Sequence, residues 1–193
     1  TDTSAAVLAE LASEDGRIQV LRQENRGVGA ALNAGIAAAR APFLARMDAD
    51  DRTVPDRLAR QVAFLNEQPE IAVVGGQHET FGAGPPRRTS YPTDPDYVAA
   101  ALLFRCCVSH PTVLMRRSLF DNQGFAYRAE RGLYPEDYLL WTQLVRGGLR
   151  IANLPEVLVY YRQWPGQATA ERPERIADMH LEVQRVRLSL LGI

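Results

Sequence analysis

Apolar residues in the first 76 positions recur alternately at the spacing of a helix and at the spacing of a strand. Helical spacing places every third or fourth apolar residue on one face, whereas strands show alternating or continuous apolar runs. The helices are expected at residues 3–14, 28–40 and 55–67, and the strands at residues 17–21, 43–47 and 71–76. This α-β-α-β-α-β order favours an α/β fold with a mostly parallel sheet and helices on its faces.

The second half of the chain has a less regular pattern. Four prolines and two glycines predict a loop over residues 82–95. Further helices are expected at 95–105, 136–147 and 171–191, and a strand at 157–161. We therefore expect one α/β domain over residues 1–170, followed by a charged amphipathic C-terminal helix over residues 171–193.

The predicted order opens on a helix. A sheet of this kind normally begins with a strand and a crossover helix, and a βαβ unit takes about 30 residues or more. The pattern therefore predicts an N-terminally partial domain that lacks the first strands of its sheet.

Composition narrows the possible partners and compartment. The 193 residues carry a formal net charge of −1, which argues against a nucleic-acid partner. The only cysteines, Cys106 and Cys107, are adjacent, which gives neither a disulfide framework nor zinc-ligand spacing. No apolar run approaches the ~20 residues of a membrane span. These features favour a cytoplasmic protein, with attachment to the inner face of the membrane as a weaker alternative for the C-terminal helix.

Three aspartates follow the predicted strand at 43–47. In an extended segment, Asp48 and Asp50 would point the same way, and two converging carboxylates repel each other unless a cation lies between them. Hard ions such as Mg²⁺ or Mn²⁺ prefer these oxygen ligands. The alternative is an acidic loop that caps the next helix, but Thr53 and Asp56 already supply a capping-box-like signal. The position after a strand favours a metal site.

Two segments resemble family 2 glycosyltransferases with the GT-A, Rossmann-like fold. They are the stretch from Asn25 to Ile36 and the Asp-x-Asp stretch from Ala45 to Asp51. The resemblance implies a nucleotide-sugar donor and a divalent metal cofactor. It also implies metal ligation by Asp50 and Asp48, and donor binding by Asn25, Gly29, Asn33 and Asp48.

A third segment, residues 133–141, resembles the Glu-Asp motif of the same family. The resemblance implies that Asp137 is the catalytic base, with Glu136 beside it in the catalytic pair. An incoming sugar hydroxyl must lose its proton as it attacks, so a positioned carboxylate is required. Asp137 shares a predicted helix face with apolar residues and should point inward, with the helix N-terminus helping to keep it ionised. Acidic residues that only complement the helix dipole are the alternative interpretation.

The resemblance also covers weaker positions. His110 lies in a Ser-His-Pro-Thr segment that resembles the acceptor side of family members. Arg162 could pair with a donor phosphate. Trp164 stands where many members have a histidine; it cannot ligate a metal, but its ring could stack on an acceptor sugar.

The sequence thus predicts an inverting, metal-dependent enzyme of polysaccharide biosynthesis. It would move a sugar from a nucleotide-diphosphate donor, with a UDP-sugar as the first expectation, to a saccharide or lipid-linked acceptor. Two alternatives stay open: a truncated or degenerate domain without catalysis, and a metal-dependent nucleotidyltransferase. The sequence does not indicate an oligomeric state.

Overall fold

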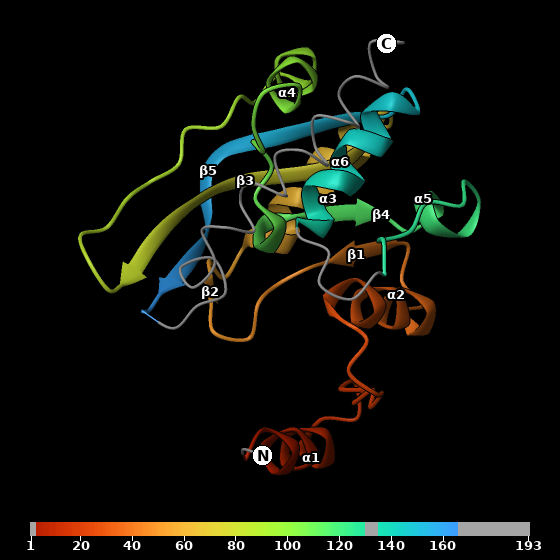
Figure 1. Cartoon of the computed structure of the whole chain (residues 1–193), viewed down its shortest axis with the longest axis vertical. Helices are drawn as coiled ribbons and strands as arrows, with labels where there is room; N and C mark the ends of the chain where they lie inside the picture. Colours follow the sequence, from red (N-terminus) through yellow and green to blue (C-terminus); the bar gives the residue numbers. More distant parts are fainter. Residues whose placement is uncertain (1–2, 130–134, 166–193) are drawn as a thin grey trace.

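Two long parallel strands form the centre of a curled sheet (Figure 1). The computed structural model describes residues 3–129 and 135–165. Within them the sheet has five strands in the order β1-β4-β3-β5-β2. The strands are β1 (Phe43–Ala45), β2 (Arg52–Thr53), β3 (Ile71–Gly82), β4 (Leu114–Arg116) and β5 (Arg150–Gln163).

Strand direction corrects one prediction. Only the β3–β5 pairing is parallel, whereas β1–β4, β3–β4 and β2–β5 are antiparallel. The predicted mostly parallel sheet is therefore wrong for the described residues. The predicted strands that became β1, β3 and β5 do run in the same direction. However, the three-residue strand β4, which is too short to give a periodic signal, separates β1 from β3.

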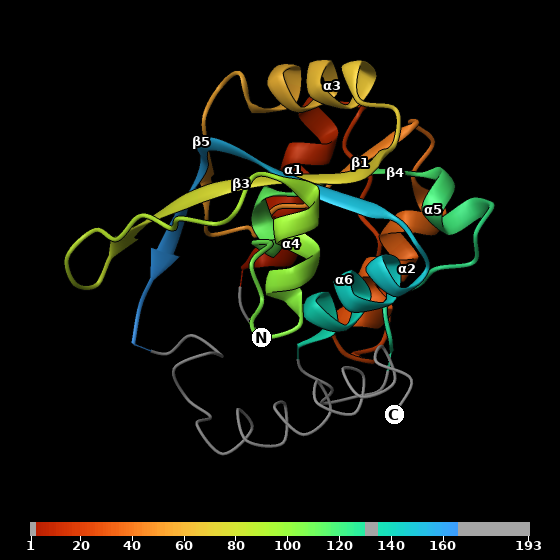
Figure 2. The ribbon, with the colours of Figure 1, turned by 90° about the horizontal axis from the view of Figure 1, so that it is seen from above.

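The helices lie on both faces of the sheet (Figure 2). On one face α3 covers a small apolar cluster that contains Leu65, Ile71 and Val74. On the other face α4 and α6 cover the larger core around Trp141 and Val73. No described helix is long and apolar enough to cross a bilayer. The helices are α1 (Ser4–Glu14), α2 (Val28–Ala38), α3 (Arg57–Glu67), α4 (Pro95–Leu102), the 3-10 helix η1 (His110–Thr112), α5 (Ser118–Asp121) and α6 (Glu136–Arg146).

The predicted helices within the described residues are confirmed, each with one end as predicted and the other shifted by one to three residues. The strand predicted at residues 17–21 is wrong, because this segment has no pairing partner in the described sheet. Its apolar side chains Ile18 and Leu21 are 38% and 54% exposed. An alternating pattern becomes a strand only where a neighbour satisfies its backbone groups. The helix predicted at 171–193 lies outside the described residues.

A buried polar pair on α3 joins the helix to three other elements. Arg57 donates from Nη2 to the carbonyl oxygens of Arg46 (2.9 Å) and Val113 (3.1 Å) and from Nε to Gln61 Oε1 (3.0 Å). Gln61 donates from Nε2 to the carbonyl oxygens of Val74 (2.9 Å) and Thr112 (2.8 Å). We call these two side chains the α3 clasp. It fixes the end of η1 and the residue that follows β1 against β3.

Gln61→Leu should lower the free energy of unfolding by about 3 kcal/mol, because two buried carbonyl groups and the Arg57 Nε–H lose their partner. Urea denaturation measures this change. The exposed Gln123→Leu variant is the matched control and should stay within about 0.5 kcal/mol of the wild type. Equal unfolding midpoints for the two variants would show that the clasp does not stabilise the fold.

Candidate functional site

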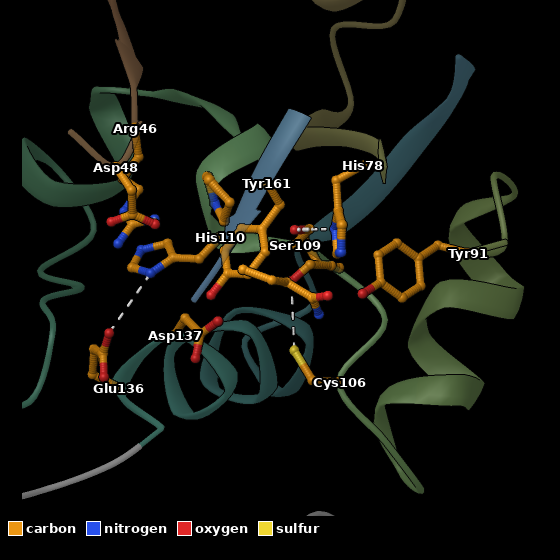
Figure 3. A pocket seen from close by; sticks show the side chains of 13 residues that line it. Arg46, Asp48, His78, Tyr91, Cys106, Ser109, His110, Glu136, Asp137 and Tyr161 are labelled. Carbon is orange, nitrogen blue, oxygen red and sulfur yellow. Dashed lines mark hydrogen bonds and ion pairs between the residues drawn. The ribbon is translucent and has the colours of Figure 1, made fainter. Parts of the chain in front are cut away.

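A pocket of about 470 Å³ lies where the ends of β1, η1, β5 and α6 meet (Figure 3). Of the predicted site residues, the pocket brings together Asp48, His110, Glu136 and Asp137. Arg46 joins them from the end of β1. The remaining lining residues are His78, Tyr91, Cys106, Val108, Ser109, Pro111, Tyr161 and Gln163.

The first turn of α6 supplies two carboxylates to this pocket. Glu136 is buried and Asp137 is half-buried, so the predicted inward orientation of Asp137 is confirmed. The Tyr138 N–H donates to Asp137 Oδ1 (2.8 Å). This is the stabilisation of the ionised carboxylate that was expected from the helix N-terminus. Burial outweighs it and raises the pKa of Asp137. Burial, and then the charge of Asp137, raise the pKa of Glu136 to about 7. Both acids are therefore stronger proton acceptors than exposed carboxylates.

His110 lies beside these carboxylates and is itself buried. Its Nε2 is 2.8 Å from the Tyr127 hydroxyl, and its Nδ1 is 3.7 Å from Glu136 Oε1. Burial, followed by the positive charge of Arg46, holds the pKa of His110 well below its usual value. His110 is thus neutral, and each ring nitrogen faces a polar group.

The aspartates form a turn instead of continuing the strand. Strand β1 ends at Ala45, and the Asp51 N–H approaches the Asp48 carbonyl oxygen at 3.4 Å. Asp48 pairs with Arg46 and lines the pocket, whereas Asp50 is exposed and does not line it. The expectation that Asp48 and Asp50 point the same way assumed an extended segment, and the turn removes that condition. Within the described residues no three His, Cys, Asp or Glu side chains form a ready metal cluster.

Asp51 is a buried member of this turn that the sequence did not single out. Its Oδ1 accepts the backbone N–H of Arg162 (2.8 Å), and its buried Oδ2 has no hydrogen-bond partner among the described residues. Burial raises the pKa of Asp51 to about 6. Arg162 also donates from Nε to the Asp50 carbonyl oxygen (2.9 Å) and lies over the Phe81 ring. The aspartate turn is therefore tied to the end of β5.

The predicted donor-binding residues around α2 do not line the pocket. Asn25 is exposed, and its Oδ1 accepts the Gly27 N–H (3.2 Å) in the turn before α2. Gly29 is buried so closely against the Arg128 carbonyl oxygen that a Cβ atom would lie 2.1 Å from it. Asn33 hydrogen-bonds to the backbone of Tyr127. These contacts pack α2 against the segment before residue 130.

The wall opposite the carboxylates is aromatic, which the sequence did not indicate. The His78 ring lies 6.1 Å from the Tyr91 ring and 5.4 Å from the Tyr161 ring, measured between centroids. His78 Nδ1 is 2.8 Å from Ser109 Oγ (Figure 3). Trp164, the predicted aromatic contact, is 48% exposed and outside the pocket lining. Tyr161, which lies on β5 three residues before Trp164, lines the pocket.

Comparison with known proteins identifies relatives of one family. The model of glycosyl transferase family 2 matches residues 1–124. An uncharacterized glycosyltransferase of Haemophilus influenzae is 37% identical over 175 residues, which cover 88% of this chain and 64% of the relative. The amylovoran biosynthesis glycosyltransferase AmsE of Erwinia amylovora is 28% identical over 169 residues, which cover 87% of this chain and 62% of AmsE. The chain thus spans somewhat less than two thirds of the length of these relatives.

Solved structures share the fold. S. aureus TarS 1-349, in complex with UDP-GlcNAc, aligns with a TM-score of 0.75 at 19% identity, covering 98% of this chain and 54% of that one. The mannosyltransferase PcManGT from Pyrobaculum calidifontis, in complex with GDP-Man and Mn²⁺, aligns with a TM-score of 0.66 at 19% identity, covering 96% of this chain and 52% of that one. The expected GT-A-like α/β fold is confirmed.

The raised pKa of Glu136 predicts a pH-dependent stability. Because the folded-state pKa of about 7 exceeds the usual value of 4.5, the protonated form favours folding. This contribution is complete below pH 4.5 and is lost as the pH rises through 7. Glu136→Gln keeps a neutral side chain, so its stability relative to the wild type should rise by on the order of 3 kcal/mol between about pH 5 and pH 8.

Urea denaturation at several pH values measures this difference. Glu70→Gln, at an exposed position, is the matched control for the substitution itself. A stability difference between Glu136→Gln and the wild type that is the same at every pH would contradict the raised pKa.

Proposed function

Because the chain belongs to glycosyl transferase family 2, we propose that its pocket transfers a sugar from a nucleotide-diphosphate donor to a saccharide or lipid-linked acceptor, with inversion at the anomeric carbon. The observation that carries the proposal is the convergence, in one pocket, of the Glu136–Asp137 pair with Asp48 and Arg46. The carboxylate pair begins a helix, and the other two residues follow the end of a strand. This arrangement places the candidate base on one side of the pocket. Arg46 and Asp48, on the other side, would face the donor phosphates.

In the proposed reaction Asp137 is the general base. The acceptor hydroxyl oxygen attacks the anomeric carbon as the bond from that carbon to the diphosphate oxygen breaks. The hydroxyl proton passes to Asp137, and the nucleoside diphosphate leaves with the bonding electrons. A single in-line displacement inverts the configuration. The raised pKa of Asp137 supports the assignment, because a base works best when its pKa approaches the working pH.

The donor diphosphate would lie at the aspartate turn. Asp48 and Asp50 offer the oxygen ligands that Mg²⁺ or Mn²⁺ prefers. In the same turn, Asp51 Oδ2 has no hydrogen-bond partner in the described part of the chain and adds unused acceptor capacity. A bound cation would neutralise the charge of the departing diphosphate. Arg162, held at the turn through Asp50 and Asp51, adds a fixed positive charge next to it.

The acceptor would lie along the aromatic wall. Apolar faces of sugar rings pack well on aromatic side chains, and Tyr91, His78 and Tyr161 supply such faces opposite the carboxylates. His110 contributes on the acceptor side through Glu136, whereas a direct role for Trp164 stays a prediction. The similarity to AmsE supports a polysaccharide acceptor.

Asp137→Asn should lower sugar transfer by roughly a hundredfold or more, since the amide cannot take the hydroxyl proton. The measurement is nucleoside diphosphate release from UDP-GlcNAc and from GDP-mannose, the donors named for the two structural neighbours. The exposed Asp96→Asn variant is the matched control and should retain activity, because its surface ion pair with Arg150 is weak. Turnover by Asp137→Asn equal to that of the wild type would remove Asp137 from this role.

Asp50→Ala should abolish the metal-dependent heat of UDP binding. Isothermal titration calorimetry with UDP and Mn²⁺ measures it, and Asp56→Ala, just past the turn, is the control. Unchanged heat in Asp50→Ala would exclude Asp50 as a metal ligand. A wild-type chain that binds no nucleotide would favour the non-catalytic alternative, and pyrophosphate release from a nucleoside triphosphate would favour a nucleotidyltransferase.

A further inference from the structure

Tyr127 connects α2 to the pocket through both its backbone and its side chain. The Asn33 amide donates to the Tyr127 carbonyl oxygen (2.8 Å) and accepts the Tyr127 N–H (3.0 Å). This two-bond contact fixes the Tyr127 backbone on α2. The ring is 2% exposed and packs near-parallel to Phe120. Tyr127 is therefore held at both ends and has little freedom to turn its hydroxyl elsewhere.

The Tyr127 hydroxyl has two candidate acceptors. His110 Nε2 lies at 2.8 Å, and the Met115 sulfur lies at 4.0 Å. A thioether is a weak acceptor, whereas a neutral imidazole nitrogen is a good one. A hydroxyl that donates to Nε2 instead of to the sulfur makes the stronger bond, and this requires an Nε2 without a proton. A neutral imidazole carries one ring proton, so that proton must then sit on Nδ1.

We propose that Tyr127 is a positioning residue for the pocket: its hydroxyl donates to Nε2 of His110 and keeps the ring proton on Nδ1, where it faces Glu136. The charged groups around this ring are Arg46 after β1 and the Glu136–Asp137 pair on α6. The edge of Trp141 packs against the ring and restricts its rotation. A chain of contacts thus runs from Asn33 through Tyr127 and His110 to the carboxylate of Glu136.

This chain of contacts gives Glu136 a defined role in the active site. The role rests on the proposed function. An Nδ1–H directed at Oε1 attracts the carboxylate to one side of the pocket. The other oxygen, Oε2, is buried and has no hydrogen-bond partner among the described residues, so its acceptor capacity is unused. Asp137 is then the proton acceptor, because the carboxylate of Glu136 is held toward His110.

The tautomer of His110 can be measured without any turnover. The chain has three histidines, so long-range ¹H–¹⁵N correlation spectra of ¹⁵N-histidine-labelled protein resolve each ring, and His110→Gln assigns the His110 signals. The expected result is a neutral ring with its proton on Nδ1. A proton on Nε2, or on both nitrogens at neutral pH, would overturn the proposal even if the protein transfers sugar normally.

Tyr127→Phe removes only the hydroxyl group. We expect the Nδ1–H preference of His110 to be lost in the spectrum. With UDP-GlcNAc or GDP-mannose as the donor, kcat should fall roughly tenfold while KM stays within about twofold, because positioning and not ground-state binding is impaired. Tyr97→Phe, at a residue 72% exposed, is the matched control and should match the wild type in both measurements.

Two outcomes separate this proposal from the proposed function. If the wild-type protein has the Nδ1–H tautomer but shows no turnover, the result contradicts the transferase assignment and supports the chain of contacts from Asn33 to Glu136. An unchanged His110 spectrum in a folded Tyr127→Phe variant would contradict the positioning role. If Tyr127→Phe fails to fold, the wild-type tautomer still decides the direction of the hydrogen bond.

Discussion

The pocket depends on the α3 clasp, the buried pair Arg57 and Gln61. Buried carbonyl groups must be hydrogen-bonded, and four of them at the edge of the pocket find their partners in these two side chains. The four carbonyls belong to the residue after β1, to β3, to η1 and to the residue before β4. The clasp supplies the side-chain hydrogen bonds that α3 makes to these four carbonyls. Two residues of the proposed site lie two positions from these carbonyls in the chain: Asp48 follows Arg46, and His110 precedes Thr112.

Burial then determines the electrostatics of the site. Arg46, whose carbonyl oxygen accepts from Arg57, directs its side chain to Asp48 and lowers the pKa of His110. His110, at the start of η1, faces the carboxylates of α6. Because burial removes them from water, the carboxyl groups of Glu136 and Asp137 hold protons more tightly, and His110 holds its proton less tightly, than in solution. A neutral histidine beside basic carboxylates suits proton acceptance from a hydroxyl group.

The sequence predicted the regular elements well wherever the element was long or strongly periodic. Helices α2, α3 and α6 and strands β3 and β5 follow from periodicity, because each has buried positions on one face or both. Helix α1 also follows from periodicity, although its apolar residues Val7, Leu8 and Leu11 are exposed in the structure. Strand β4 and the unpaired segment at 17–21 could not be predicted, since pairing is decided by residues distant in sequence. The prediction of a mostly parallel sheet was wrong for the same reason.

The candidate site was predicted in part, and the division has a physical cause. Asp48, His110, Glu136 and Asp137 stand in motifs, and the fold brings them to one pocket. Asp48 and Asp50 were expected in an extended segment, but the chain turns after β1, and Asp48 lines the pocket whereas Asp50 does not. Periodicity cannot detect such a turn. Residues such as Tyr127 and Tyr91 have no local signal, because their roles arise from packing between segments that are far apart in the sequence.

Two buried carboxylate oxygens at the site lack hydrogen-bond partners among the described residues. Most buried polar atoms in a folded protein have partners, yet Asp51 Oδ2 and Glu136 Oε2 have none among the described residues. Burying such oxygens lowers stability, and a neutral or apolar side chain would avoid the loss. One of these oxygens lies at the proposed phosphate side, and the other lies beside the proposed base. The site therefore retains unused acceptor capacity at two buried oxygens, one in the turn proposed to hold the cation and one beside the proposed base.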